Sequence, residues 1–118
     1  MESVVRTWSM RLNAGDNKGV AQLFSLPATM IQAPFVYRLV NRHQIALCES
    51  GLPCSGRIVS IAVKGTYATA VFVLGKRPSK RCDAPGSLAA ARFEIVAGKI
   101  VSWQQVPVPP GAAAATVA

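Results

Sequence analysis

Apolar residues in the first part of the chain recur at helical spacing. Between Ser3 and Asn13 the residues that follow this spacing are Val4, Val5, Trp8 and Leu12. Such a stripe is typical of an amphipathic helix. Asp16 is expected to cap a second short helix, which Pro27 ends.

A β-prone segment and a third helix follow. Residues 28–36 are largely apolar and predict a strand. Pro34 has no N–H to donate, so we expect it at an edge, a bulge or a strand end. Asn41 is expected to cap a third helix over residues 42–50, and Gly51 closes it.

After Cys54 the apolar pattern changes from the helical period to a period of two, which indicates a sheet. The alternating segments pair around turns at Gly65 and Gly98. They span residues 57–64, 67–74, 87–96 and 100–108. Helices followed by strands predict an α+β domain with its helices on one face of an antiparallel sheet.

Length and composition fit one folded domain. The chain has 118 residues, of which 51% are hydrophobic, and this apolar content offsets the entropy of ordering. Residues 107–118 are uncharged and rich in proline and alanine, so we expect a disordered tail after a domain at residues 1–106. The pattern contains neither a membrane-spanning run nor a signal peptide. We therefore expect a soluble protein without membrane insertion, cytoplasmic as written or exported if a leader was removed.

The chain is basic, with 13 Lys and Arg residues against 5 Asp and Glu residues. Its densest basic cluster comprises Lys76, Arg77, Lys80 and Arg81. Binding of nucleic acid through this cluster would also need exposed aromatic side chains or a groove-reading helix. The pattern supplies neither, so we interpret the cluster as a solvated loop and expect no nucleic-acid partner.

The cysteine and histidine content argues against a metal site. Cys48, Cys54 and Cys82 have no C-x-x-C spacing, and His43 is the single histidine. We expect no metal and no other cofactor. Cys48 follows Ile45 on the apolar side of the third predicted helix, so a buried, inert thiol is expected there.

Two segments resemble the nuclear transport factor 2-like superfamily, which includes ketosteroid isomerases, scytalone dehydratase and polyketide cyclases. These segments are residues 12–24 (LNAGDNKGVAQLF) and 93–103 (FEIVAGKIVSW), and the resemblance covers roughly residues 3–106. It implies a cone-shaped, curved antiparallel β-sheet wrapped around three N-terminal helices. It also implies a pocket at the wide end of the cone and a homodimer. It does not imply a reaction, because this fold hosts unrelated chemistries.

The catalytic pattern of the ketosteroid isomerases is missing. The family's oxyanion-hole tyrosine falls at Trp8, its general base at Gln32 and its protonated acid at Ala91. An indole is not an acidic phenol, an amide cannot abstract a proton at neutral pH, and alanine has no ionisable group. The resemblance therefore implies the fold of this superfamily but not the ketosteroid isomerase activity.

Several side chains are expected to line or approach the implied pocket. They are Trp8, Leu12, Gln32, Tyr37, His43 and Phe93. The first hypothesis is that the domain binds a small hydrophobic or amphipathic ligand in this pocket. The bulk of Trp8 leaves an alternative open, in which the domain's own side chains fill the space.

Two other functions remain open. An isomerase, dehydratase or cyclase could position a carbonyl with Gln32 and Trp8 and move a proton with His43 or Tyr37. His43 has no visible orienting partner, since Glu49 lies on another face of the same predicted helix. A dimeric protein-interaction module is the second alternative, and exposure of large apolar residues on the sheet, such as Trp103 or Val101, would support it.

The segments around Cys54 (LPCSGRI) and Cys82 (KRPSKRCDAPGS) are similar to actinobacterial members of the superfamily, some of which are exported. That similarity implies a Cys54–Cys82 disulfide, which would join the start of a strand to a loop. Reduced cytosolic thiols are the alternative.

Overall fold

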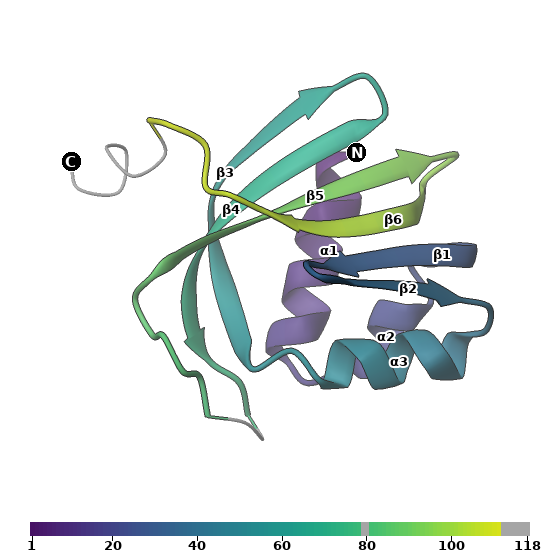
Figure 1. Ribbon diagram of the computed structural model, residues 1–118, viewed down its shortest axis with the longest axis horizontal. Helices are drawn as coiled ribbons and strands as arrows, with labels where there is room; N and C mark the ends of the chain where they lie inside the picture. Colours follow the sequence, from purple (N-terminus) through teal and green to yellow (C-terminus); the bar gives the residue numbers. More distant parts are fainter. Residues whose placement is uncertain (79–80, 112–118) are drawn as a thin grey trace.

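The computed structural model describes residues 1–78 and 81–111 (Figure 1). It consists of three helices and one six-stranded sheet. The helices are α1 (Glu2–Asn13), α2 (Asn17–Ala21) and α3 (Arg42–Ser50). The strands are β1 (Phe24–Gln32), β2 (Phe35–Leu39), β3 (Cys54–Lys64), β4 (Tyr67–Lys76), β5 (Leu88–Val96) and β6 (Lys99–Val106). The predicted α+β class is confirmed.

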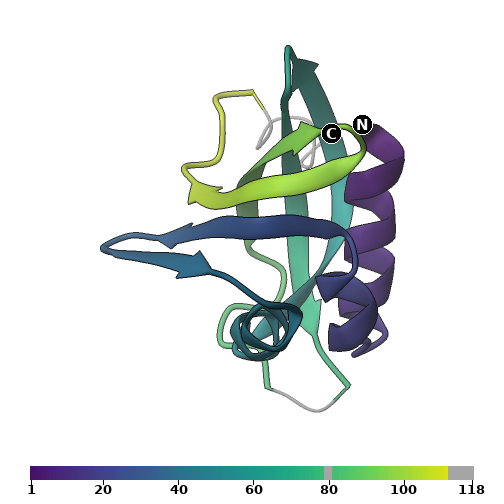
Figure 2. The ribbon, with the colours of Figure 1, turned by 90° about the vertical axis from the view of Figure 1, so that its right-hand side faces the viewer.

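The sheet is curved and open, with the strand order β2-β1-β6-β5-β4-β3. Helix α1 runs along one face of the sheet, and α2 and α3 lie together at one end of it (Figures 1 and 2). Every neighbouring pair is antiparallel except β1 and β6, which are parallel, so the sheet is mixed. These two strands come from distant parts of the chain, and no hairpin turn forces them to run in opposite directions.

The local signals at helix ends and hairpins are confirmed. The side chain of Asp16 accepts a hydrogen bond from the Gly19 N–H, and the side chain of Asn41 accepts one from the Gln44 N–H, each at 2.9 Å. Gly98 has a φ of +76° in the turn between β5 and β6, a conformation that glycine adopts without steric cost.

The prediction for the region around Pro27 is wrong. Helix α2 ends at Ala21, and Pro27 lies inside β1 instead of ending a helix. The register between β1 and β6 shifts on the segment that contains Pro27, so a residue without an N–H is tolerated there. The single strand predicted over residues 28–36 is two strands, which Pro34 separates in the connecting turn.

The core lies between α1 and the sheet, with Trp8 at its centre. The Trp8 ring meets Phe93 edge-on at 5.1 Å between ring centroids, and Trp103 lies at 6.2 Å. Trp103 is only 5% exposed. It therefore gives no support to an interaction surface on the sheet, for which it would have to be exposed.

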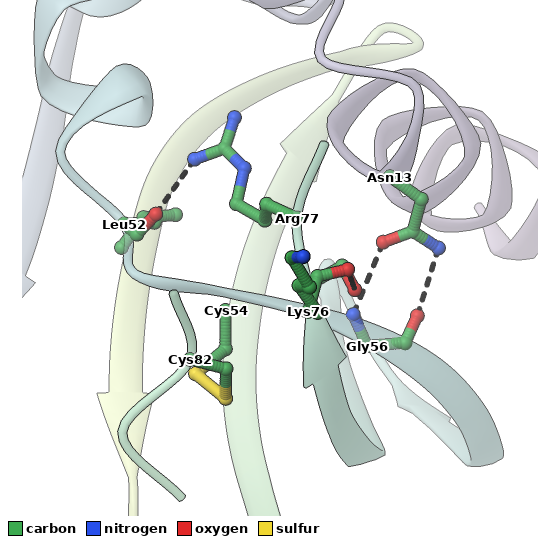
Figure 3. Close-up of a disulfide and its surroundings, with 8 residues drawn as sticks. Asn13, Leu52, Cys54, Gly56, Lys76, Arg77 and Cys82 are labelled. Carbon is green, nitrogen blue, oxygen red and sulfur yellow. Dashed lines mark hydrogen bonds between the residues drawn. A yellow bond between two sulfur atoms is a disulfide. The ribbon is translucent and has the colours of Figure 1, made fainter. Parts of the chain in front are cut away.

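The basic cluster is not a uniformly solvated loop. Arg77 is buried and donates a hydrogen bond to the Leu52 carbonyl at 2.7 Å (Figure 3). It donates another to the Glu49 carbonyl at 2.8 Å. It also donates to Asn17 Oδ1 at 2.9 Å. A buried guanidinium is tolerated when its donors are satisfied. Lys80, which was also predicted to be solvated, lies outside the described residues.

A disulfide joins Cys54, at the start of β3, to Cys82, in the loop after β4 (Figure 3). The Cα atoms are 4.7 Å apart, within the range that a disulfide requires. The third cysteine, Cys48, is free and half-buried. Burial, and secondarily the charge of Glu49, raise the pKa of the Cys48 thiol, which lowers its reactivity.

No helix among residues 1–78 and 81–111 is long and apolar enough to cross a membrane.

Replacing both Cys54 and Cys82 by serine is expected to lower the free energy of unfolding by about 3 to 4 kcal/mol, because the disulfide restricts the unfolded chain over its loop. The bonded cysteines are 28 residues apart. Urea denaturation followed by circular dichroism measures the loss, and dithiothreitol should produce a similar loss in the unmodified chain. Cys48→Ser is the control. Unchanged stability of the double variant would contradict the stabilising role of this disulfide.

Candidate functional site

A cavity of about 140 Å³ opens between α1 and the sheet. Trp8 and Leu12 line it from α1, and Gln32 lines it from the end of β1. The segment after α3 supplies Leu52 and Pro53, and the remaining walls come from β3 to β6. Most of these side chains are apolar, so the cavity suits a ligand with an apolar body.

Small side chains on β5 contribute to the space. Ala89, Ala90 and Ala91 all line the cavity, and Phe72 lines it from the neighbouring strand. Gly56 brings β3 close to this wall: a Cβ atom there would lie 2.8 Å from the Cβ of Phe72. The shape of the cavity therefore depends on the small alanine and glycine residues of its wall as much as on the aromatic rings.

Two glutamine amides give the cavity a polar side. Gln32 is half-buried and its Nε2 donates a hydrogen bond to Gln105 Oε1 at 3.4 Å. Within the described part of the chain, this bond leaves Gln32 Oε1 and Gln105 Nε2 without a partner. The Gln32 carbonyl oxygen and the Gln105 NH2 group are thus available to a polar group on a ligand.

Glu49 is a fully buried carboxyl group next to the cavity wall. Its Oε1 accepts a hydrogen bond from Trp8 Nε1 at 3.2 Å, and its Oε2 has no partner among the described residues. Burial raises the pKa of Glu49 to about 7, although the Trp8 hydrogen bond and the positive charge of Arg77 lower it. The group therefore changes its charge near neutral pH, directly behind a residue that lines the cavity.

Three of the six side chains proposed for the pocket line the cavity. They are Trp8, Leu12 and Gln32. Phe93 does not line it, but packs against Trp8 from within the core and is fully buried.

Tyr37 and His43 lie elsewhere. Tyr37 lies on β2 and is 42% exposed. Strand β2 does not continue β1 but turns back and pairs with it as a hairpin. His43 is exposed in the first turn of α3. Neither side chain lines the cavity.

Sequence reasoning missed the role of Glu49. One signal for it was available, because Glu49 follows Ile45 by four residues and so shares the buried face of α3. Its partner Trp8 is 41 residues away along the chain. No local pattern could have joined the two.

In the described part of the chain, no three His, Cys, Asp or Glu side chains are grouped so that they could hold a metal ion.

Comparison with known proteins identifies structural neighbours. No protein-family model matches the sequence, and the search of curated proteins gives no match. A solved protein from Cytophaga hutchinsonii, described as an NTF2-like protein of unknown function, is 10% identical with a TM-score of 0.68, and the match covers 89% of this chain and 87% of that one. NTF2 denotes nuclear transport factor 2.

Two further solved structures match over nearly the whole chain. A hypothetical protein from Catenulispora acidiphila with a ketosteroid isomerase-like fold, in complex with trimethylamine, is 16% identical with a TM-score of 0.67; the match covers 97% of this chain and 92% of that one. A de novo designed protein with a curved β-sheet is 12% identical with a TM-score of 0.73, over 98% and 91% of the two chains. At such identities the matches establish the fold, and chemistry must be argued from the site.

Glu49→Gln is expected to remove a pH dependence of stability. Because the folded state holds a proton on Glu49 up to about pH 7, the folded chain binds more protons than the unfolded one between about pH 4.5 and pH 7, so stability falls as pH rises through that window. Relative to the Gln variant, the unmodified chain should lose about 3 kcal/mol between about pH 4.5 and pH 8. Urea denaturation at a series of pH values measures this difference. Parallel curves for the two proteins would contradict the raised pKa.

Proposed function

We propose that this chain, which has the nuclear transport factor 2-like fold, binds a small apolar or amphipathic molecule in the cavity beside Trp8. The observation that carries the proposal is an apolar cavity whose two amides, on Gln32 and Gln105, have free hydrogen-bonding capacity within the described residues. A cavity built in this way favours a ligand with one apolar body and one polar group.

The size of the cavity limits the ligand. Its volume of about 140 Å³ is close to that of engineered protein cavities that accept benzene, about 150 Å³. Drug-sized ligands occupy about 300 Å³ or more. A single ring with a hydroxyl or carbonyl group fits this volume, whereas a four-ring steroid does not. A protein of the same fold was solved with the small molecule trimethylamine, which supports a ligand of this size class.

The enzymatic alternative has less support. Tyr37 and His43, the side chains suggested for proton transfer, are exposed and do not line the cavity. Glu49 has a suitable pKa near 7 but is fully buried and is also not part of the cavity lining. A catalytic acid or base must reach the proton that it transfers. Binding is therefore the function that we propose.

Filling the cavity should abolish ligand binding. Ala89 is a half-buried cavity residue, so Ala89→Phe places a ring where the ligand would lie. We expect phenol, measured by isothermal titration calorimetry, to bind the unmodified chain and to bind this variant at least about tenfold more weakly. Ala62→Phe, at an exposed position on β3, is the matched control and should bind like the unmodified chain. Equal affinities for the two variants would contradict the proposal.

A second proposal is a homodimer that forms through β2. This strand is at the edge of the sheet, and its residues Phe35, Val36 and Tyr37 are 59%, 67% and 42% exposed. The rings of Phe35 and Tyr37 stack with centroids 6.2 Å apart. An uncovered apolar edge strand invites pairing with another chain. Antiparallel pairing of β2 with its copy would cover both edges by two-fold symmetry.

Val36→Lys should disrupt this dimer, because a lysine on an edge strand opposes strand pairing. We expect the unmodified chain to elute with twice the mass of the monomer in size-exclusion chromatography with light scattering, and Val36→Lys to elute as a monomer. Val63→Lys, at a 49% exposed position on β3, is the matched control and should remain dimeric. A monomeric unmodified chain at high concentration would rule out this interface.

A further inference from the structure

A second hollow lies between α1 and the outer part of the sheet. It is an open groove of about 850 Å³, lined by one side of α1 and by residues 55–58 of β3 and 73–76 of β4. Ser55, Gly56 and Leu74 border both this groove and the cavity. The groove differs from the cavity in its charge, because three cationic side chains line it.

Arg6 from α1, Arg57 from β3 and Lys76 from β4 are exposed and all line the groove. Among the described residues, no Asp or Glu lines it. Within residues 1–78 and 81–111, none of these three side chains forms an ion pair or a hydrogen bond, although Glu2 precedes Arg6 by one helical turn. Three like charges around one groove repel one another, and a bound anion would relieve that repulsion.

Four other cations in the described part of the chain have hydrogen-bond partners within the protein. The side chains that donate hydrogen bonds to oxygen atoms of the protein are Arg11, Arg77, Arg92 and Lys99. The groove cations therefore differ from these in having no structural role that the described residues reveal.

The walls of the groove are partly apolar. Met10 is 63% exposed, and Ile58 and Val73 line the groove with it. No aromatic side chain of the part of the chain that the structure describes lines the groove, so these residues offer no stacking surface of the kind that single-stranded nucleic acid uses. Its volume of about 850 Å³ is in the range of sites for small molecules.

We propose that this groove binds an amphipathic organic anion: a molecule with an apolar body and a carboxylate, sulfonate or phosphate group. Arg6, Arg57 and Lys76 bind the anionic group, while Met10 and Ile58 contact the apolar body. This site is separate in chemistry from the uncharged cavity, and it does not depend on ligand binding there.

A matched pair of dyes tests the proposal. Anilinonaphthalenesulfonate is an apolar anion whose fluorescence rises on binding, and phenylnaphthylamine has the same rings without the sulfonate. We expect the sulfonate dye to bind the unmodified chain at least about tenfold more tightly than the neutral dye, and its affinity to fall when the salt concentration is raised. Equal affinities for the two dyes would overturn the proposal.

Variants locate the site. The double variant Arg6→Gln with Arg57→Gln should weaken binding of the sulfonate dye at least about tenfold, whereas Arg38→Gln, at an exposed arginine on β2, should leave it unchanged. Equal losses in both variants would show a general effect of net charge and overturn the proposal. Circular dichroism checks that each variant is folded; if the double variant is not, Lys76→Gln takes its place.

Ala89→Phe separates this site from the cavity. The filled cavity should leave binding of the sulfonate dye unchanged, whether or not phenol binds to the unmodified chain. Loss of dye binding in Ala89→Phe would assign the dye to the cavity and overturn the groove site. Amide chemical-shift changes confined to α1 and to residues 55–58 and 73–76, the elements that line the groove, would support the groove directly.

Discussion

The Trp8 indole N–H needs an acceptor inside an apolar core, and the Glu49 carboxyl supplies it. This one hydrogen bond joins α1 to α3 at the centre of the molecule, because the rings of Phe72, Phe93 and Trp103 pack around Trp8. Without an acceptor, the buried donor would carry an uncompensated desolvation cost. Arg77 holds the same end of α3 by donating to the Glu49 carbonyl. The contacts among Trp8, Glu49 and Arg77 therefore support one wall of the cavity and also hold α1 and α3 together.

Signals that act over a few residues were readable from the sequence. Asp16 and Asn41 cap their helices where their side chains indicate, and Gly65 and Gly98 mark the hairpins. These positions follow from local sterics and from nearby hydrogen-bond donors. Pro27 misled the interpretation because its place inside β1 depends on a register shift against a distant strand, β6.

The site was less predictable because its residues meet across the chain. The resemblance was enough to place Trp8 and Gln32 in the cavity lining. Excluding Tyr37 and His43 from that lining required the positions of the β1–β2 hairpin and of α3. Burial of Arg77 depends on carbonyls 25 and 28 residues away. A basic residue among other basic residues gives no sign of such partners. The composition therefore suggested that the Arg77 guanidinium is solvated, whereas in the folded chain it is buried.

The two edge strands of the sheet, β3 and β2, differ in what covers their outer backbone groups. On β3, the side chain of Asn13 accepts from the Gly56 N–H at 3.0 Å and donates to the Gly56 carbonyl at 2.9 Å (Figure 3), so it imitates the backbone of a neighbouring strand. The β2 edge has only β1 beside it. Addition of a strand is therefore obstructed at Gly56 on the β3 edge, whereas the β2 edge has no such contact among the described residues. In the proposed β2 dimer both β3 edges would face outward, and on each of them the Asn13 contact would oppose strand addition at Gly56.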